Sequence, residues 1–129
     1  MSHFSHIKTQ FQNLFYLTKS LDRLNIKYQK QEQTSHISES TLSHVNLVIP
    51  QSNSYNIQFC WNNQEYELIA DKMFWKQVYP IQMFIDRITQ QYAGEVVIGE
   101  SQKLGFQTVT YQQNEDGSNI LILERWKEN

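Results

Sequence analysis

Apolar residues repeat at helical spacing in two parts of the chain. In the first part, leucines recur at intervals of three, four and three residues, which predicts an amphipathic helix from Leu14 to about Leu24. Asn13 precedes this helix and can cap its amino end, and Asn25 can adopt the left-handed conformation that ends it. We expect the chain to return as a strand over residues 26–31.

A second helix is predicted to follow Pro80, because the missing N–H of proline suits the first turn of a helix. Its core-facing positions are Ile81, Phe84, Ile85, Ile88 and Tyr92. We expect Ala93-Gly94 to end this helix. Residues 95–104 fit two states, since Val96-Val97-Ile98 favours a strand and the polar run before Gly105 favours a last helical turn. Of these two states we expect the helix.

Residues 55–61 and 64–70 predict a β-hairpin that turns at Asn62-Asn63, a pair that tolerates the backbone angles of a tight turn. Pairing Trp61 with Gln64 would give the hairpin one apolar face and would place Cys60 opposite Glu65 on a polar face. Such a pair of faces is typical of a sheet that is packed on one side.

The segment Gly105–Trp126 predicts a closing hairpin, with a polar turn ending at Gly117 and the apolar run Ile120–Leu123 in its second strand. The expected loop pairs Tyr111 with Ile120. A run that is apolar on both faces belongs in the middle of a sheet that is covered on both sides. We therefore expect this hairpin to form the sheet core on which the earlier elements pack.

The remaining segments are shorter or more polar. Residues 4–11 and 45–49 are expected to be strands, and Asp71 is expected to cap a short helical turn that reaches Lys76. Residues 31–43 follow neither a helical nor a strand period, so we expect a polar surface loop of the kind that is often mobile. The order predicts a single α+β domain over residues 1–129, an antiparallel β-sheet of hairpins with two main amphipathic helices packed on it.

The composition is that of an ordinary globular protein and argues against some classes of partner. Of the 129 residues, 40% are hydrophobic and 19% are charged, and the net charge is −2. The eleven Lys and Arg residues are scattered, so nucleic-acid binding is not expected, since it would need a basic patch. No apolar run approaches the ~20 residues that span a bilayer, and we expect neither a secretory signal nor an import leader. The oligomeric state is left open.

The histidines and the single cysteine are the first candidates for chemistry. His3 and His6 are three residues apart, which sends them to opposite faces of a strand, and His36 and His44 lie in or beside the polar segment. We expect none of them to bind a metal. Cys60 is expected in mid-strand opposite a carboxylate, which raises the pKa of a thiol and opposes its use as a nucleophile.

No other arrangement of residues predicts a catalytic or cofactor-binding site. The glycines match no phosphate-binding loop, and the three tryptophans are explained by packing at a sheet edge as well as by a binding surface. The carboxylates form no pair suited to acid–base chemistry; those considered are Asp71, Asp86, Glu95, Glu100 and Glu124. We therefore expect no catalytic residue, no metal and no cofactor, and favour a protein that is not an enzyme.

Several blocks along the chain resemble one known family. They are the opening MSHFSHIKTQF, the helix LTKSLDRLNIKY, the middle segment YNIQFCWNNQEYELIADKMFW, and the short blocks Tyr92–Ala93, Leu104–Phe106, Asp116–Ser118 and Glu124–Trp126. In order and spacing they resemble the conserved plastid and cyanobacterial family called hypothetical chloroplast reading frame thirty-five. The resemblance covers nearly the whole chain and is weakest over residues 31–43.

The resemblance implies a location rather than a chemistry. The family is encoded in algal plastids and in cyanobacteria, so it implies a chloroplast protein of the stroma, or a cytoplasmic one in a cyanobacterium. The family has no established activity or cofactor to transfer. Two hypotheses remain: a small non-enzymatic accessory or interaction protein with an unknown protein partner, or a small-molecule-binding protein or enzyme with a site between the sheet and residues 31–43.

Overall fold

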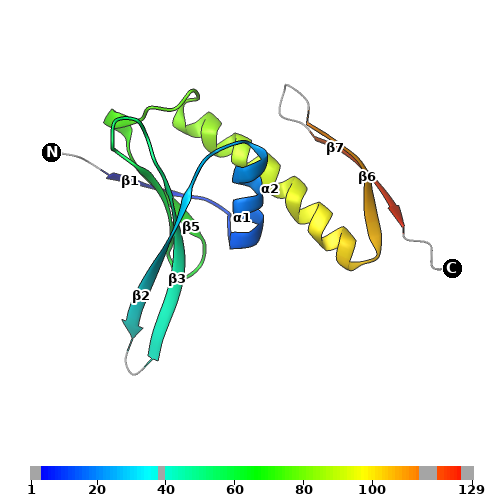
Figure 1. Cartoon of the computed structure of the whole chain (residues 1–129), viewed down its shortest axis with the longest axis horizontal. Coiled ribbons are helices and arrows are strands. Elements are labelled where there is room, and N and C mark those ends of the chain that lie inside the picture. Colours follow the sequence, from blue (N-terminus) through cyan, green and yellow to red (C-terminus); the bar gives the residue numbers. More distant parts are fainter. Residues whose placement is uncertain (1–3, 38–39, 114–118, 126–129) are drawn as a thin grey trace.

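The computed structural model describes the backbone of residues 4–37, 40–113 and 119–125, and the side chains of residues 4–32 and 44–105. Five strands form one antiparallel sheet in the order β1-β5-β4-β3-β2, and two more form a separate sheet, β6-β7 (Figure 1). An α+β fold with an antiparallel sheet and two main helices is therefore confirmed. In chain order the elements are β1 (Phe4–Lys8), α1 (Leu14–Arg23), β2 (Gln29–Ile37), β3 (Ser40–Ile49), β4 (Ile57–Trp61), β5 (Tyr66–Asp71), the 3-10 helix η1 (Lys72–Phe74), α2 (Ile81–Lys103), β6 (Phe106–Gln113) and β7 (Asn119–Arg125).

The apolar core lies between the two helices and one face of the five-stranded sheet (Figure 1). Burial alternates along β4 and β5, which confirms the predicted apolar and polar faces of this hairpin. Each large apolar side chain buried in this way stabilises the fold by about 1.5–3 kcal/mol. The buried apolar cluster comprises Phe11, Leu17, Leu21, Leu47, Ile49, Ile57, Phe59, Tyr66, Leu68, Ala70, Phe84, Ile85 and Ile88.

Helix α1 has the boundaries that its sequence predicts. The side chain of Asn13 accepts a hydrogen bond from the backbone N–H of Tyr16 at 3.3 Å, so Asn13 caps the amino end. Asn25 has a φ of 58° and turns the chain after the helix. Asp71 caps η1 as expected, where its carboxylate accepts from the backbone N–H of Met73 at 3.0 Å, but this helical turn ends at Phe74 and not at Lys76.

Helix α2 is longer than predicted. It runs without interruption from Ile81 to Lys103, so the expected end at Ala93-Gly94 is wrong and residues 95–103 are helical. A glycine inside a helix is unfavourable by only about 1 kcal/mol relative to alanine, and here Gly94 is buried, with α1 packed against α2. Gly105, with a φ of +89°, follows the helix instead.

The β4–β5 hairpin differs from the prediction in its register. Trp61 pairs with Tyr66 and Cys60 pairs with Glu67, a shift of two residues that leaves each side chain on its expected face. The loop is longer than a two-residue turn because the Asn62 side chain accepts from the backbone N–H groups of Gln64 at 2.9 Å and Glu65 at 2.8 Å.

The prediction of a polar loop over residues 31–43 is wrong for the part of this segment that the structure describes. β2 reaches Ile37, β3 begins at Ser40, and the two pair continuously from Gln29 opposite Val48. Residues 38–39 lie outside the described ranges. The β2–β3 hairpin extends beyond the helices (Figure 1), and backbone pairing needs no apolar side chains, so this hairpin shows no strand period in its sequence.

The closing hairpin is not the centre of the main sheet. Among the described residues, β6 and β7 pair only with each other. They also contact α2, which carries the chain about 35 Å along its 23 residues before β6 begins. The apolar run at Ile120–Leu123 thus predicted a strand but not its neighbours. Its expected register is also wrong by one residue, since Tyr111 pairs with Leu121 and an irregularity lies between Thr108 and Thr110. Trp126 and the turn at residues 114–118 lie outside the described residues.

Candidate functional site

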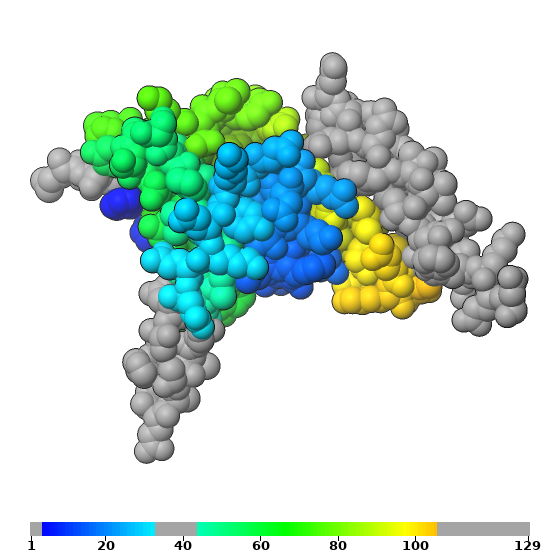
Figure 2. All heavy atoms as spheres, in the orientation of Figure 1, coloured from blue at the N-terminus to red at the C-terminus, as the bar shows by residue number. Residues whose placement is uncertain are grey.

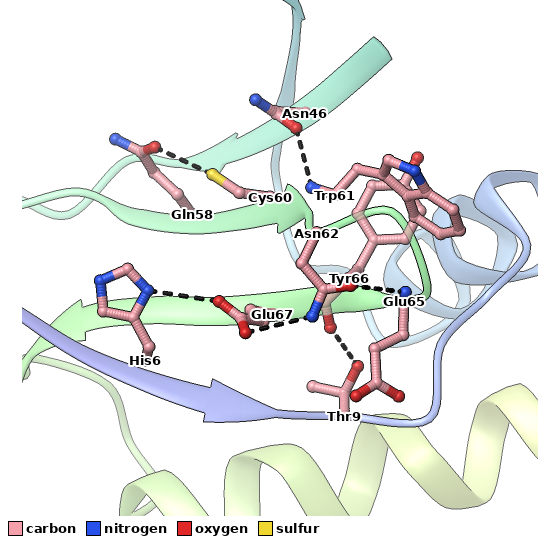
Figure 3. A network of polar contacts seen from close by, with 10 residues as sticks. All are labelled: His6, Thr9, Asn46, Gln58, Cys60, Trp61, Asn62, Glu65, Tyr66 and Glu67. Atoms are coloured by element: carbon pink, nitrogen blue, oxygen red, sulfur yellow. Dashed lines mark hydrogen bonds and ion pairs between the residues drawn. The ribbon is translucent and has the colours of Figure 1, made fainter.

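Polar side chains gather on the outer face of the sheet, where β1, β5 and β4 lie side by side (Figure 3). Glu67 is their centre. One of its oxygens lies 3.3 Å from Nδ1 of His6, and the other accepts a hydrogen bond from Nδ2 of Asn62 at 3.1 Å. Cys60 is its partner across the β4–β5 pairing. We call His6, Cys60, Asn62 and Glu67 the outer-face network.

Local sequence explains why these four residues meet. His6, Glu67 and Cys60 occupy outward positions of three neighbouring strands, in two adjacent rows of the sheet. Asn62 reaches the same face from the β4–β5 loop, where its carbonyl oxygen organises the loop and leaves the amide nitrogen to bind Glu67. A single side chain therefore joins the turn to the strand.

The electrostatics of the network oppose nucleophilic or basic chemistry. The hydrogen bonds from Asn62 and then from His6 lower the pKa of Glu67, because both favour its ionised form. Burial, and secondarily the charge of Glu67, raise the pKa of the Cys60 thiol, which donates to the Gln58 side chain at 3.4 Å. The rise expected for Cys60 is confirmed, although Glu67 rather than Glu65 is the carboxylate opposite. A thiol held protonated is a poor nucleophile, and a carboxylate of lowered pKa is a weak base.

A second set of contacts beneath this face joins the strands where backbone pairing stops. Asn46 accepts from the backbone N–H of Trp61 at 3.1 Å, just beyond the last β3–β4 pair (Figure 3). The Tyr66 hydroxyl donates to the Val45 carbonyl at 3.1 Å, and Thr9 donates to the carbonyl of Tyr66. Burial raises the pKa of Tyr66. These groups are satisfied within the fold, so their role is structural.

The other candidates from the sequence lie apart from one another. His44 lies near the Trp61 ring, with ring centres 6.5 Å apart, whereas His3 and the side chains of His36 and Glu124 lie outside the described residues. The described carboxylates each have a separate place: Asp71 caps η1, Asp86 accepts from Gln82, Glu95 binds Arg23, and Glu100 lies near Tyr16 and Lys103. Among the side chains that the structure describes, no three His, Cys, Asp or Glu residues gather as a metal site.

A region that the sequence did not single out is the Met73–Met83 segment, which runs from η1 through the connection to the first turn of α2. Three of its large apolar side chains face solvent: Val78 is 92% exposed, Met73 78% and Met83 49%. Figure 2 shows the segment as lime-green spheres along the upper edge of the molecule. Two features of the sequence could have indicated this exposure: Val78 precedes the predicted helix, and Met83 falls outside the apolar stripe of that helix. Neither residue is therefore at a position expected to face the core.

The backbone of this segment is held in place although those side chains are exposed. The Gln51 side chain accepts from the Lys76 N–H at 2.8 Å, and Asn53 donates to the Phe74 carbonyl at 2.9 Å. The Tyr55 and Phe74 rings stack with centres 3.8 Å apart. Trp75 donates from its indole to the Tyr79 carbonyl at 2.8 Å. The segment is therefore an ordered surface that presents apolar groups.

Neither of the described α-helices is long and apolar enough to cross a membrane. No solved structure matches the chain. Residues 20–122 match the family described as "Protein of unknown function (DUF1257)".

Full-length relatives agree with this match. The chain is 56% identical over 120 residues to "Uncharacterized protein ycf35" of Trieres chinensis, covering 92% of this chain and 94% of that protein. Proteins of the same name from Guillardia theta and Pyropia yezoensis are 38% and 35% identical; these alignments cover 98% of this chain and 99% and 98% of the relatives. The chain therefore belongs to the ycf35 family, as its sequence blocks predicted.

Proposed function

We propose that this protein is a small, non-enzymatic interaction protein of the plastid stroma, and that it binds a protein partner through the Met73–Met83 segment. The observation that carries the proposal is the exposure of Met73, Val78 and Met83 on a backbone held by hydrogen bonds. Large exposed apolar surfaces on soluble proteins commonly mark contact sites.

The rigidity of the segment supports this role energetically. A surface that is already ordered loses little conformational entropy on binding, so more of the contact energy appears as affinity. Burying one Val or Met side chain contributes about 1.5–3 kcal/mol. Two or three such side chains at the centre of an interface would act as its main source of binding energy.

The chemistry of the outer-face network supports a non-enzymatic role. Its thiol has a raised pKa and its carboxylate a lowered one, both away from values that suit a nucleophile or a base near neutral pH. The plastid location rests on the family resemblance and on the algal relatives that share the name ycf35.

Affinity capture from algal plastid extract tests this proposal with a matched pair of variants. Met83 and Val97 both lie in α2 and are 49% and 46% exposed, so Met83→Glu and Val97→Glu add the same charge at equally exposed helical positions. We expect a reproducible partner to bind the natural chain and Val97→Glu, and to be lost with Met83→Glu. Equal capture by both variants, or no specific partner at all, would contradict the proposal.

A further inference from the structure

A small hollow lies at the start of α2, on the side facing the connection between α1 and β2. Its volume is about 180 Å³, and its walls are mostly apolar; the lining residues are Leu24, Ile26, Gln77, Val78, Tyr79, Phe84 and Arg87. Pockets for drug-sized ligands measure roughly 300–1,000 Å³. This hollow therefore suits a smaller molecule, and it lies elsewhere than the site between the sheet and residues 31–43 that the sequence suggested.

Among the described residues of the lining, Arg87 is the one that carries a charge. Its guanidinium lies over the Tyr79 ring, 4.5 Å from the ring centre, which fixes its position by a cation–π contact. Among the described residues it has no carboxylate within ion-pair distance and no hydrogen-bonding partner, whereas Arg23 on α1 is paired with Glu95 at 2.8 Å. Asp86, its neighbour in sequence, accepts from Gln82.

A positioned but unpaired guanidinium offers five N–H donors in a planar fork, the arrangement that matches a carboxylate. Beside it, Leu24, Ile26 and Phe84 offer an apolar wall for a hydrocarbon group. We propose that this hollow binds a small amphipathic monocarboxylate, whose carboxylate pairs with Arg87 and whose short hydrocarbon chain fills the apolar end. This inference does not rest on the proposed protein partner, although Gln77, Val78 and Tyr79 of the lining belong to the Met73–Met83 segment.

The test is a titration of the ¹⁵N-labelled full chain with hexanoate, followed by NMR at the backbone of residues 77–79 and at the Arg87 side chain. Hexanamide keeps the chain and removes the charge, and acetate keeps the charge and removes the chain. Arg87→Gln removes the proposed partner. Lys76→Gln removes one exposed positive charge nearby and serves as the control of equal net charge.

We expect saturable binding of hexanoate to the natural chain and to Lys76→Gln, with shifts confined to the hollow. Both changes remove a hydrogen bond between charged groups, so hexanamide, and hexanoate with Arg87→Gln, should bind about ten-fold or more weakly. Each methylene removed from the carboxylate series should weaken binding about four-fold.

Three outcomes would overturn the inference: no saturable binding of hexanoate, equal affinity for hexanamide, or unchanged affinity in a folded Arg87→Gln variant. Met73→Glu, at an exposed position of the segment that does not line the hollow, should leave hexanoate affinity unchanged and should weaken capture of a protein partner. The failure of one proposal can therefore be told from the failure of the other.

Discussion

The two halves of α2 pack against the rest of the protein by different means. The first half inserts Phe84, Ile85 and Ile88 into the apolar core beneath the sheet. The second half lies against α1 and buries polar groups instead, among them Gln91 and Glu95. One continuous helix thus has an apolar interface followed by a polar one.

The polar interface is built from specific contacts. Glu95 has a side chain only 5% exposed, binds Nε of Arg23 at 2.8 Å and accepts from Gln91 at 3.2 Å. One turn further on, Gly99 leaves room for the ring of Tyr16, whose hydroxyl donates to Glu100 at 3.3 Å. Apolar contacts are tolerant of small shifts, whereas an ion pair and a close ring contact require one alignment of α1 on α2.

The largest effect is expected in the apolar half. Ile88 is fully buried, so Ile88→Ala removes buried surface and leaves a cavity, which should lower the free energy of unfolding by about 2–5 kcal/mol. Val97→Ala, at an exposed position of the same helix, should change it by less than about 0.5 kcal/mol. Urea denaturation of both variants checks this; equal losses would mean that the burial of Ile88 in the core does not determine the size of its effect.

The buried ion pair should respond unequally to loss of its two members. Arg23→Gln leaves the buried carboxylate of Glu95 with a weaker partner, and should cost about 2 kcal/mol, below the usual 3–5 because Arg23 is 53% exposed and water can partly replace it. Glu95→Gln leaves a guanidinium that water can solvate, and should cost about 1 kcal/mol or less. If both variants lost the same stability in denaturation experiments, the pair would contribute only through the attraction between its charges, with no added cost for leaving the Glu95 carboxylate buried.

The close approach at Gly99 predicts the next effect. A Cβ there would lie 2.3 Å from the Tyr16 hydroxyl oxygen and 2.6 Å from a ring carbon, so Gly99→Ala forces the ring away and should cost about 1–2 kcal/mol despite the better helix propensity of alanine. Adding Tyr16→Ala should remove that penalty, because the clash needs both side chains. A double-mutant cycle with no coupling would refute the contact.

The same contrast explains what the sequence could and could not predict. Apolar spacing located α1, the first half of α2 and the inward faces of β4 and β5, because those elements bury one apolar face. It wrongly ended the helix at Ala93-Gly94, in a stretch whose buried positions are Gln91, Gly94 and Glu95, although the polar run before Gly105 did favour the helix observed over residues 95–103. It also predicted strands at residues 26–31 and 45–49 but missed the paired strands within residues 31–43. Elements held by polar groups or by backbone pairing leave no apolar period to detect.

The candidate sites were less predictable still. The raised pKa of Cys60 followed from a strand register that was wrong by two residues, yet the parity was right and a carboxylate stood opposite in either register. Arg87 and Met83 could not be identified from the sequence, because an unpaired arginine and an exposed methionine resemble any surface residue until their neighbours are placed.

The less buried counterpart of the Glu95 pair is Glu67 with His6, and the loss of Glu67 should give the smallest effect on stability, visible mainly in its dependence on pH. The folded state lowers the pKa of Glu67 below its ordinary value of 4.5, so the stability that its charge contributes is present above about that pH. This contribution to stability is lost as the pH falls through the lower pKa that Glu67 has in the folded state. The natural chain should therefore lose more stability than Glu67→Gln between about pH 5 and pH 3.

Cys60 reports on the same carboxylate without unfolding the protein. The charge of Glu67 contributes to its raised thiol pKa after burial, so Glu67→Gln should speed alkylation by iodoacetamide at pH 8 by on the order of two-fold. Gln58→Leu, which removes the acceptor of the thiol but leaves Glu67 in place, should not reproduce this gain. An unchanged rate in Glu67→Gln would mean that burial alone holds the thiol protonated, and that the outer-face network is not electrostatically coupled.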